Sequence, residues 1–314
     1  MSDKLDSVLK SLEKDSPGLV TFAKELEGKL EVIPFTIPSL DAITGVGGVV
    51  KGRMTEIFGM DGTFKTTLAL YAIAEAQRRG GMCAFIDAEF AFSAEYAEKI
   101  GVDIDQLILI HPSSAEEAFN VMEKLIDTKE IDLIVLDSIA SLSPSTELAN
   151  EFGSSNMGVM ARLIGQMLRK LTAKLGKSNT ALILINQLRE QLGGYVPMKT
   201  TPGGNAPRFY ATLRLEIKKA AIKDGKEQTG VTLTVKTVKN KLSTPFLETE
   251  LEAMFGEGID IEKDLIKTAV ERGIIQKAGA GWMTYGEVKL QGLDKFKAFF
   301  SDNPEAFEDL KKLL

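Results

Sequence analysis

The segment FGMDGTFKTT, residues 58–67, carries the residue types that bind phosphate groups, at almost the spacing of a nucleotide-binding loop. The usual pattern is G-x-x-x-x-G-K-[ST], and Gly59, Lys65 and Thr66 stand at its positions. Such a loop binds phosphate because backbone N–H groups and a helix N-terminus converge on the anion, while the lysine adds positive charge. The sequence therefore predicts a nucleotide site formed by Gly59, Met60, Asp61, Gly62, Thr63, Phe64, Lys65, Thr66 and Thr67.

Phe64 departs from this pattern, because it stands where the second glycine is expected. If the backbone at this position needs a positive φ, a phenylalanine has a steric cost that glycine does not have. If the position is already helical, the side chain points away from the phosphates. Gly62 could supply the flexible corner in either case. A glycine turn that only joins a strand to a helix is the alternative without a nucleotide.

Two carboxylates stand at the ends of apolar runs, Asp137 in IDLIVLDS and Glu89 in FIDAEFAF. The carboxyl ends of parallel strands lie at one edge of a sheet, where ligands bind. Asp137 is predicted to hold Mg²⁺ through water, with Thr66 as the second metal-binding residue. Glu89 is predicted to orient and activate the water that attacks the γ-phosphate. A strand-capping aspartate and a surface glutamate are the simpler alternatives.

The elements that must position these residues follow a regular alternation. From Arg53 onward, short aliphatic runs such as MTEIF, MCAFID and TALILIN are separated by longer helical patterns. This order predicts an α/β fold with a mostly parallel twisted sheet and helices on both faces. Two segments of period-two alternation flank KDGKEQ and predict a hairpin that extends the sheet.

Three regions are predicted: residues 1–34 as an N-terminal helix and linker, 35–257 as the core, and 258–314 as a small α+β domain. The first helix has an apolar stripe that could pack on its own domain or on a neighbouring copy, formed by Leu5, Val8, Leu9 and Leu12.

Composition excludes several classes. No run of about 18 apolar residues is present, so a membrane span is not expected. The N-terminus lacks the order of a signal peptide, and the single Cys83 favours a reducing cytoplasm. The net charge of −6 argues against a surface that coats nucleic acid generally, yet it leaves room for a local basic groove. The only histidine, His111, has no Cys or His companion for zinc.

Several further motifs occur together and in one order: AFIDAE, YAEKIGVDID, IVLDSIASLSP, INQLRE, TTPGGNAPRFYATLRL and VKNKLSTPF. Through them the chain resembles the RecA-type homologous-recombination ATPases from about Phe35 to Trp282, and more weakly to its ends. Bacterial members normally have glycine at the position of Phe64, and the phage recombinase UvsX is more similar here. The resemblance thus suggests a phage-encoded or divergent bacterial member, with a RecA-like ATPase core and with ATP and Mg²⁺ as cofactors.

The resemblance also implies roles for residues outside the loop. Tyr96 would stack on adenine, although Ser93 replaces an aspartate that often accompanies it, and core packing is the alternative. Gln187 would sense the γ-phosphate and pass the signal to DNA, where otherwise it would only cap a strand. Lys239 and Lys241 share one face of a strand and would reach the nucleotide of the adjacent subunit, whereas an ordinary lysine pair would face solvent. The catalytic set is Lys65, Glu89, Asp137, Gln187, Lys239 and Lys241.

Residues 150–162 and 188–208 resemble the two DNA-binding loops of the family, the alternative being surface loops that only cover an edge. Glycines let backbone amides approach phosphates, and arginines supply local positive charge. The predicted DNA-binding residues are Met157, Gly158, Arg162, Arg169, Arg189, Gly203, Gly204, Asn205 and Arg208.

The function implied is an ATP-dependent recombinase that forms helical filaments on single-stranded DNA and pairs it with homologous duplex DNA. A DNA-dependent ATPase of this kind could also have loader or single-strand-binding partner proteins. A ring-forming DNA helicase or packaging motor shares this core, and a non-catalytic filament protein would result if Phe64 abolished turnover.

Overall fold

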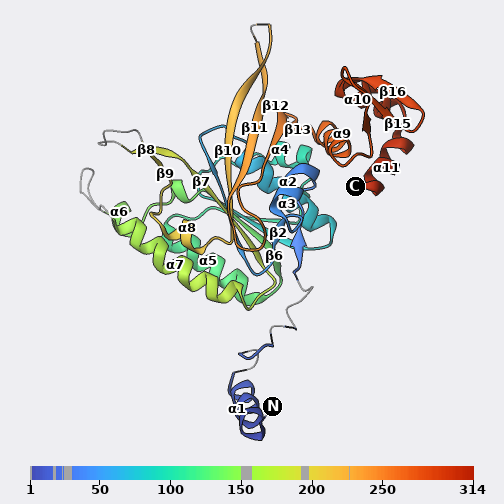
Figure 1. Cartoon of the computed structure of the whole chain (residues 1–314). Coiled ribbons are helices and arrows are strands. Elements are labelled where there is room, and N and C mark those ends of the chain that lie inside the picture. Colours follow the sequence, from blue (N-terminus) through green and yellow to red (C-terminus); the bar gives the residue numbers. More distant parts are fainter. Residues whose placement is uncertain are drawn as a thin grey trace. The chain divides into compact units, whose positions relative to one another are not determined.

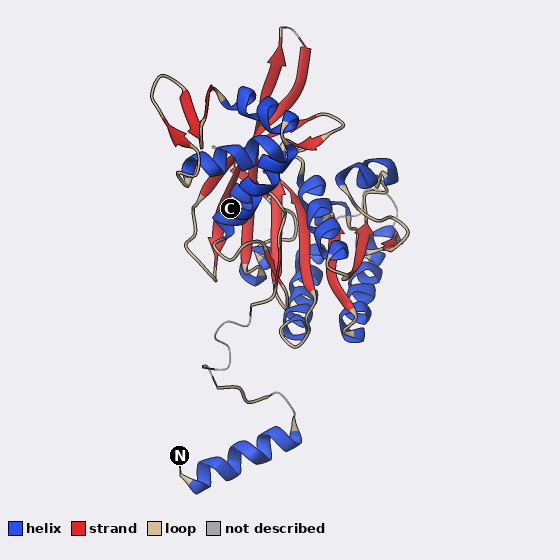
Figure 2. Ribbon diagram, turned by 90° about the vertical axis from the view of Figure 1, so that its right-hand side faces the viewer, coloured by secondary structure: helices blue, strands red, loops and turns tan. Residues whose placement is uncertain are grey.

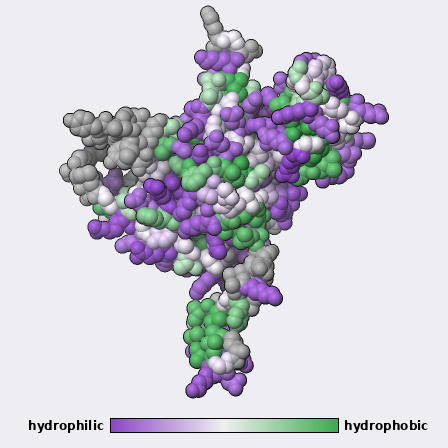
Figure 3. Space-filling model, in the orientation of Figure 1, coloured by the Kyte–Doolittle hydropathy of each residue, from purple (hydrophilic) through white to green (hydrophobic). Residues whose placement is uncertain are grey.

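The computed structural model describes residues 2–16, 19–22, 24, 30–149, 158–191, 198–225 and 227–314. The chain divides into two units, Met1–Glu31 and Val32–Leu314. The first contains α1 (Asp3–Asp15), which begins after Ser2, whose side chain accepts a hydrogen bond from the N–H of Leu5. None of the residues of α1 is buried, and Leu5, Val8 and Leu12 are exposed. Figure 3 shows this helix with an apolar, green patch.

The second unit is built on a sheet whose nine described strands have the order β13-β12-β11-β10-β3-β7-β6-β4-β5. Parallel pairing runs from β5 to β10 through β3, and antiparallel pairing joins β10 to β11, β12 and β13. The mostly parallel α/β fold and the hairpin are thereby confirmed. The strands are β3 (Met54–Gly59), β4 (Met82–Asp87), β5 (Leu107–Ile110), β6 (Ile131–Asp137), β7 (Ala181–Gln187), β10 (Leu213–Asp224), β11 (Glu227–Asn240), β12 (Glu248–Met254) and β13 (Gly258–Ile259).

Helices cover both faces of this sheet (Figures 1 and 2). Because successive strand side chains point to opposite faces, Leu133 and Val135 of β6 face one apolar cluster and Ile134 and Leu136 face the other. The first cluster lies under α2 (Pro38–Thr44), α3 (Lys65–Arg78) and α4 (Ala94–Ile100). The second lies under α5 (Ala115–Thr128) and α7 (Val159–Leu175). This two-sided burial explains why the inner strands read as continuous apolar runs.

The end of the chain forms a small domain with its own apolar cluster, which includes Ile266, Phe296, Phe300 and Leu310. A three-stranded antiparallel sheet, β14 (Gln276–Lys277), β15 (Trp282–Tyr285) and β16 (Val288–Gln291), packs with α9 (Ile261–Glu271), α10 (Leu293–Asp302) and α11 (Pro304–Leu313). The small α+β domain that the sequence predicts at the end of the chain is therefore present.

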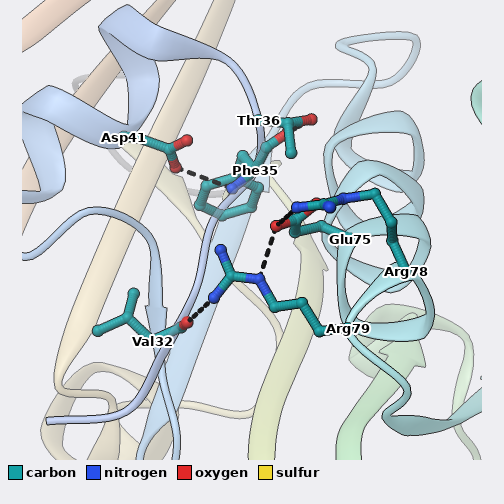
Figure 4. Close-up of polar contacts among 7 residues, drawn as sticks. All are labelled: Val32, Phe35, Thr36, Asp41, Glu75, Arg78 and Arg79. Carbon is teal, nitrogen blue, oxygen red and sulfur yellow. Dashed lines mark hydrogen bonds and ion pairs between the residues drawn. The ribbon is translucent and has the colours of Figure 1, made fainter. Parts of the chain in front are cut away.

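The far end of α3 is fixed by charged groups (Figure 4). Glu75 is buried, and its carboxylate accepts a hydrogen bond from Nε of Arg79 at 2.6 Å, while Nη1 of Arg79 donates to the carbonyl of Val32 at 3.1 Å. Asp41 accepts the N–H of Phe35 at 2.8 Å, and burial raises the pKa of Asp41 to about 7. The hydrogen bond between Arg79 and Val32 attaches the chain that enters the core to the helix that follows the predicted nucleotide loop.

Within the described part of the chain, none of the helices combines the length and the apolar character needed to cross a membrane.

Candidate functional site

The phosphate loop, residues 59–66, lies between the end of β3 and the start of α3. Gly59 has no room for a side chain, because a Cβ there would lie 2.5 Å from the carbonyl oxygen of Ile217. Gly62 has a φ of +63°, which favours glycine. Thr63 is buried and donates to the carbonyl of Met60 at 2.8 Å, which closes the loop on itself. The strand, loop and helix that the motif requires are all present.

Phe64 has left-handed backbone angles, φ 57° and ψ 27°, at the N-cap of α3. Of the two alternatives for this residue, the first is therefore correct: the position has the conformation for which glycine is suited. A non-glycine residue there costs about 1–2 kcal/mol. The ring is half-buried against the apolar core and lies nearly parallel to Phe255, with ring centroids 6.4 Å apart and an interplanar angle of 11°.

Lys65 is buried, and its Nζ donates to the carbonyl of Met60 at 2.9 Å. Burial lowers the pKa of Lys65, while the negative charges of Asp137, Asp61 and Glu89 act in the opposite direction. A lysine held in this way is a positive charge at the centre of the loop.

Thr66 and Asp137 meet at the edge of the sheet, where Oγ1 of Thr66 donates to Oδ2 of Asp137 at 2.5 Å. Burial raises the pKa of Asp137 to about 6, so the carboxyl is mostly ionised at pH 7. Mg²⁺ prefers oxygen ligands and is usually held by one or two carboxylates together with substrate phosphates. A hydroxyl and a carboxylate at this distance, facing an open pocket, fit that requirement.

Glu89 is positioned by the turn after β4. The buried carboxylate of Asp87 accepts the N–H groups of Glu89, Ala91 and Phe92 at 3.1, 3.3 and 3.0 Å. Sequence reasoning missed this role of Asp87, although an aspartate at a strand end that caps its own following turn is a recognisable signal.

The carboxylate of Glu89 is a meeting point for three donors. Its Oε1 accepts hydrogen bonds from Ser138 Oγ at 2.5 Å, Gln187 Nε2 at 2.9 Å and Ser141 Oγ at 3.2 Å. Gln187 ends β7, so the structure joins the residue predicted to activate water to the residue predicted to report on the γ-phosphate. The two serines were not recognised from the sequence.

These groups line one open pocket of ≈ 400 Å³. Its walls are the seven residues 61–67 together with Glu89, Asp137 and Gln187. Residues from four separate strand ends and loops thus converge on one space, which is the arrangement that a triphosphate site requires.

Tyr96 lies in α4, and its hydroxyl is 2.9 Å from Oγ1 of Thr67 in the first turn of α3. The ring is partly buried against the core. Ser93 caps α4 by accepting the N–H of Tyr96 at 3.3 Å. Tyr96 therefore lies beside the phosphate loop, and its stacking on adenine stays a prediction.

Lys239 is the last residue but one of β11, and Lys241 follows the end of this strand, so the two do not lie in one strand as predicted. Neither lines the pocket of their own chain. Nζ of Lys239 donates to the carbonyls of Arg208 and Phe209 at 2.7 and 3.0 Å. Burial, followed by the charges of Lys241 and Arg214, lowers the pKa of Lys239 to about 8. Two ammonium groups are thus held close together outside the pocket.

Behind the pocket a charged network crosses three strands. Glu56 of β3 is fully buried, and its carboxylate accepts hydrogen bonds from Nε of Arg214 at 2.5 Å and Nδ2 of Asn186 at 3.0 Å. Asn186 also donates to the carbonyl of Pro202 at 3.1 Å. The guanidinium of Arg214 lies 4.4 Å from the centre of the Phe58 ring.

The predicted DNA loops are described at their flanks. Gly158 is the N-cap of α7, with a φ of +84°, and Arg162 is exposed on the first turn. Gly203 and Gly204 have φ values of +90° and +65°. A Cβ on Gly203 would lie 3.0 Å from Ile164 of α7, so the end of the second loop packs against the helix that follows the first.

The remaining residues of this group take separate positions. Arg169 donates to the hydroxyl of Tyr210 at 3.1 Å, and Arg189 donates to the carbonyl of Ala140 at 3.0 Å. Asn205 and Arg208 are exposed at the start and within α8 (Ala206–Tyr210). Met157 lies outside the described residues. DNA contact by these residues stays a prediction.

Comparison with known proteins agrees with this geometry. The RecA N-terminal domain model matches residues 2–260, and the RecA C-terminal domain model matches residues 263–314. The chain is 45% identical to Protein RecA of Thermus thermophilus over 313 residues, which cover 98% of this chain and 92% of that protein. It is 45% identical to Protein RecA of Aquifex pyrophilus, with 98% and 90% covered, and 43% identical to that of Bacteroides thetaiotaomicron, with 100% and 97% covered. The chain therefore belongs to the RecA family, and it is an ATP-dependent DNA recombinase with DNA-dependent ATPase activity.

Proposed function

We propose that the pocket at the edge of the sheet binds ATP with Mg²⁺ and hydrolyses it to control a helical filament on single-stranded DNA. The observation that supports this most directly is the hydrogen bond between Gln187 and Glu89, in the same pocket as the Thr66–Asp137 pair. It joins the hydrolytic machinery to the strand that continues toward the second DNA loop.

Phosphate binding follows from the loop geometry. The N–H groups at the start of α3 face the pocket, and Lys65 places its charge at the same point. Thr66 and Asp137 would hold Mg²⁺, the aspartate through water. When bound, the ion neutralises charge on the β- and γ-phosphate oxygens.

Glu89 would orient the attacking water and take up its proton. Its three donors fix the carboxylate, and the amide of Gln187, at the end of β7, is the donor that we expect to turn toward a γ-phosphate. Such a turn would free one lone pair of Glu89 and change the side-chain contacts at the end of β7, which leads into β8 (Arg189–Gln191). Nucleotide and DNA would then favour the same state, which is the condition for coupling between two sites.

Lys239 and Lys241 would act on the nucleotide of the adjacent subunit. Because neither lines its own pocket, the pair is available to a neighbour. On reaching a triphosphate, Lys239 would exchange the carbonyls of Arg208 and Phe209 for phosphate oxygens. That exchange would move α8, which follows the second DNA loop. Hydrolysis would therefore require an assembled interface.

Assembly itself is supported by exposed apolar side chains. Leu5, Val8 and Leu12 of α1 are exposed, and β5, at one edge of the sheet, exposes Ile108 and Leu109. Edge strands with apolar side chains are templates for another chain. We propose that α1 docks on a neighbouring subunit. We further propose that homologous duplex DNA is the second substrate. The protein would act in the cytoplasm, together with loader or single-strand-binding partner proteins.

The decisive experiment compares the full-length protein with the variants Lys65→Ala and Glu89→Gln. A labelled-ATP titration with Mg²⁺ should show binding by E89Q and none by K65A, while both lose DNA-stimulated hydrolysis and K65A loses strand exchange. Glu98→Gln, an exposed glutamate on α4, is the matched control and should behave as the wild type. Normal hydrolysis by E89Q, or strand exchange by K65A, would contradict the assignment, and electron microscopy would separate an open filament from a closed ring.

A further inference from the structure

We propose that Phe255 is a positioning residue for the phosphate loop: its ring supports Phe64 and so holds the loop in its nucleotide-binding conformation. This inference rests on the proposed nucleotide site. It assigns a specific role to a residue that follows β12, far from the loop in sequence.

The conformation of Phe64 sets the direction of α3. Its carbonyl accepts the N–H of Leu68 at 3.1 Å, the first hydrogen bond of the helix. The backbone angles at residue 64 therefore decide where the N–H groups of residues 65–67 point. No side-chain hydrogen bond caps this helix. The backbone of Phe64 is thus held by the loop on one side, by the helix on the other, and by its own ring.

The partner of the Phe64 ring lies in a corner whose backbone is hydrogen-bonded to neighbouring elements. Phe255 donates its N–H to the carbonyl of Thr229 at 3.2 Å, and Ile259 donates its N–H to the hydroxyl of Tyr71 in α3 at 3.1 Å. Gly258 fits closely against the same residue, since a Cβ there would lie 2.7 Å from the Tyr71 hydroxyl. The corner formed by residues 255–259 is therefore attached to α3 two turns after the phosphate loop. Phe255 brings its ring from this corner to Phe64, although 51% of its own surface stays exposed.

A glycine at position 64 would need no such support. A phenylalanine in the left-handed region is disfavoured by its Cβ, and a contact made only in that conformation offsets part of this cost. Offset stacked aromatic pairs contribute amounts equivalent to about 2- to 12-fold in an equilibrium constant. The support that Phe255 gives should therefore be visible in nucleotide affinity, and only while residue 64 is a phenylalanine.

The test is a double-mutant cycle on the full-length protein. Dissociation constants for labelled ATP with Mg²⁺ are measured for the wild type, Phe255→Ala, Phe64→Gly and the double variant. F255A should bind ATP about 2- to 12-fold more weakly with an unchanged kcat. In the F64G background the same substitution should have no effect. Phe255→Tyr should keep the wild-type affinity, and Trp282→Ala, which truncates an exposed aromatic of the small domain, should change nothing.

Equal weakening by F255A in both backgrounds would overturn the inference, because it would mean that Phe255 acts on the nucleotide or on the fold without Phe64. Unchanged affinity in F255A would overturn it as well. If F255A folds poorly, Phe255→Leu keeps apolar bulk without a ring and should give the same background-dependent loss. Failure of the proposed function is distinguishable, since the wild type itself would then bind no ATP.

Discussion

Replacing Arg214 by methionine should destabilise the core strongly, because it leaves a fully buried carboxylate without its counter-charge. Glu56 is 0% exposed, and Arg214 donates to it at 2.5 Å. In Arg214→Met the carboxylate keeps, among the described residues, only the amide of Asn186 as a side-chain donor. Removing one partner of a buried ion pair typically costs about 3–5 kcal/mol. A methionine recovers some contact with the Phe58 ring, so we expect the lower half of that range.

The matched control is an ion pair at the surface of the same sheet. Lys236 and Glu248 pair across β11 and β12 at 3.1 Å, with 38% and 58% of their side chains exposed. Pairs of this kind contribute about 0–1 kcal/mol. Lys236→Met should therefore cost no more than that, which isolates the effect of burial.

The double variant Glu56→Leu/Arg214→Met tests the reasoning from the other side. It removes both charges, and Asn186 keeps the carbonyl of Pro202 as an acceptor. Apolar replacement of a whole buried pair is often neutral or stabilising. Urea unfolding followed by circular dichroism, without nucleotide, gives the free energy of unfolding for each variant. A loss of stability in R214M no larger than that in K236M, or a double variant as unstable as R214M, would contradict this role of the ion pair.

Three further predictions concern the site and the pH dependence of ATP binding and of stability. Because burial raises the pKa of Asp137 to about 6, this carboxylate becomes protonated between pH 7.5 and 5, and the Mg²⁺-dependent affinity for ATP should fall about tenfold. Titrations of Asp137→Asn over the same pH range are the control and should show no such dependence. Gln187→Ala leaves Glu89 its two serine donors, so hydrolysis without DNA should persist. Stimulation of hydrolysis by single-stranded DNA should fall at least about tenfold. Equal stimulation of the wild type and the variant would exclude a role of Gln187 in coupling DNA to hydrolysis. The pKa of Asp41 is raised in the folded state to about 7, so its contribution to stability is complete below pH 3.8 and is lost as the pH rises to 7. Asp41→Asn keeps an acceptor for the N–H of Phe35, so its free energy of unfolding at pH 8 should exceed that of the wild type by up to about 4 kcal/mol. If the free energies of unfolding of the two proteins changed in parallel with pH, this expectation would be wrong.

The sheet could be predicted because its strands are buried on both faces. Runs such as IDLIVLD and ALILINQ leave few alternatives, and the turn residues between helical patterns mark the crossovers. The loop and the two carboxylates could be predicted for the same reason, since each directly follows a strand and parallel strands bring their carboxyl ends together.

The contacts that give the site its geometry join residues far apart in the chain, and no local pattern encodes them. Gln187 and Glu89 are 98 positions apart in the sequence, yet their side chains share a hydrogen bond. The conformation of Phe64 was undecided because both alternatives are compatible with the same ten residues; the left-handed backbone angles at this position distinguish them. The carbonyl partners of Lys239 depend on where α8 packs, which the sequence does not indicate.

The positive φ at Phe64 also restricts which residues can replace it during evolution. Valine, isoleucine and threonine are branched at Cβ and are the least compatible with left-handed angles. Asparagine and glycine are the most compatible. Glycine in place of phenylalanine therefore fits this turn as it stands, whereas a branched residue here would require the turn to be rebuilt.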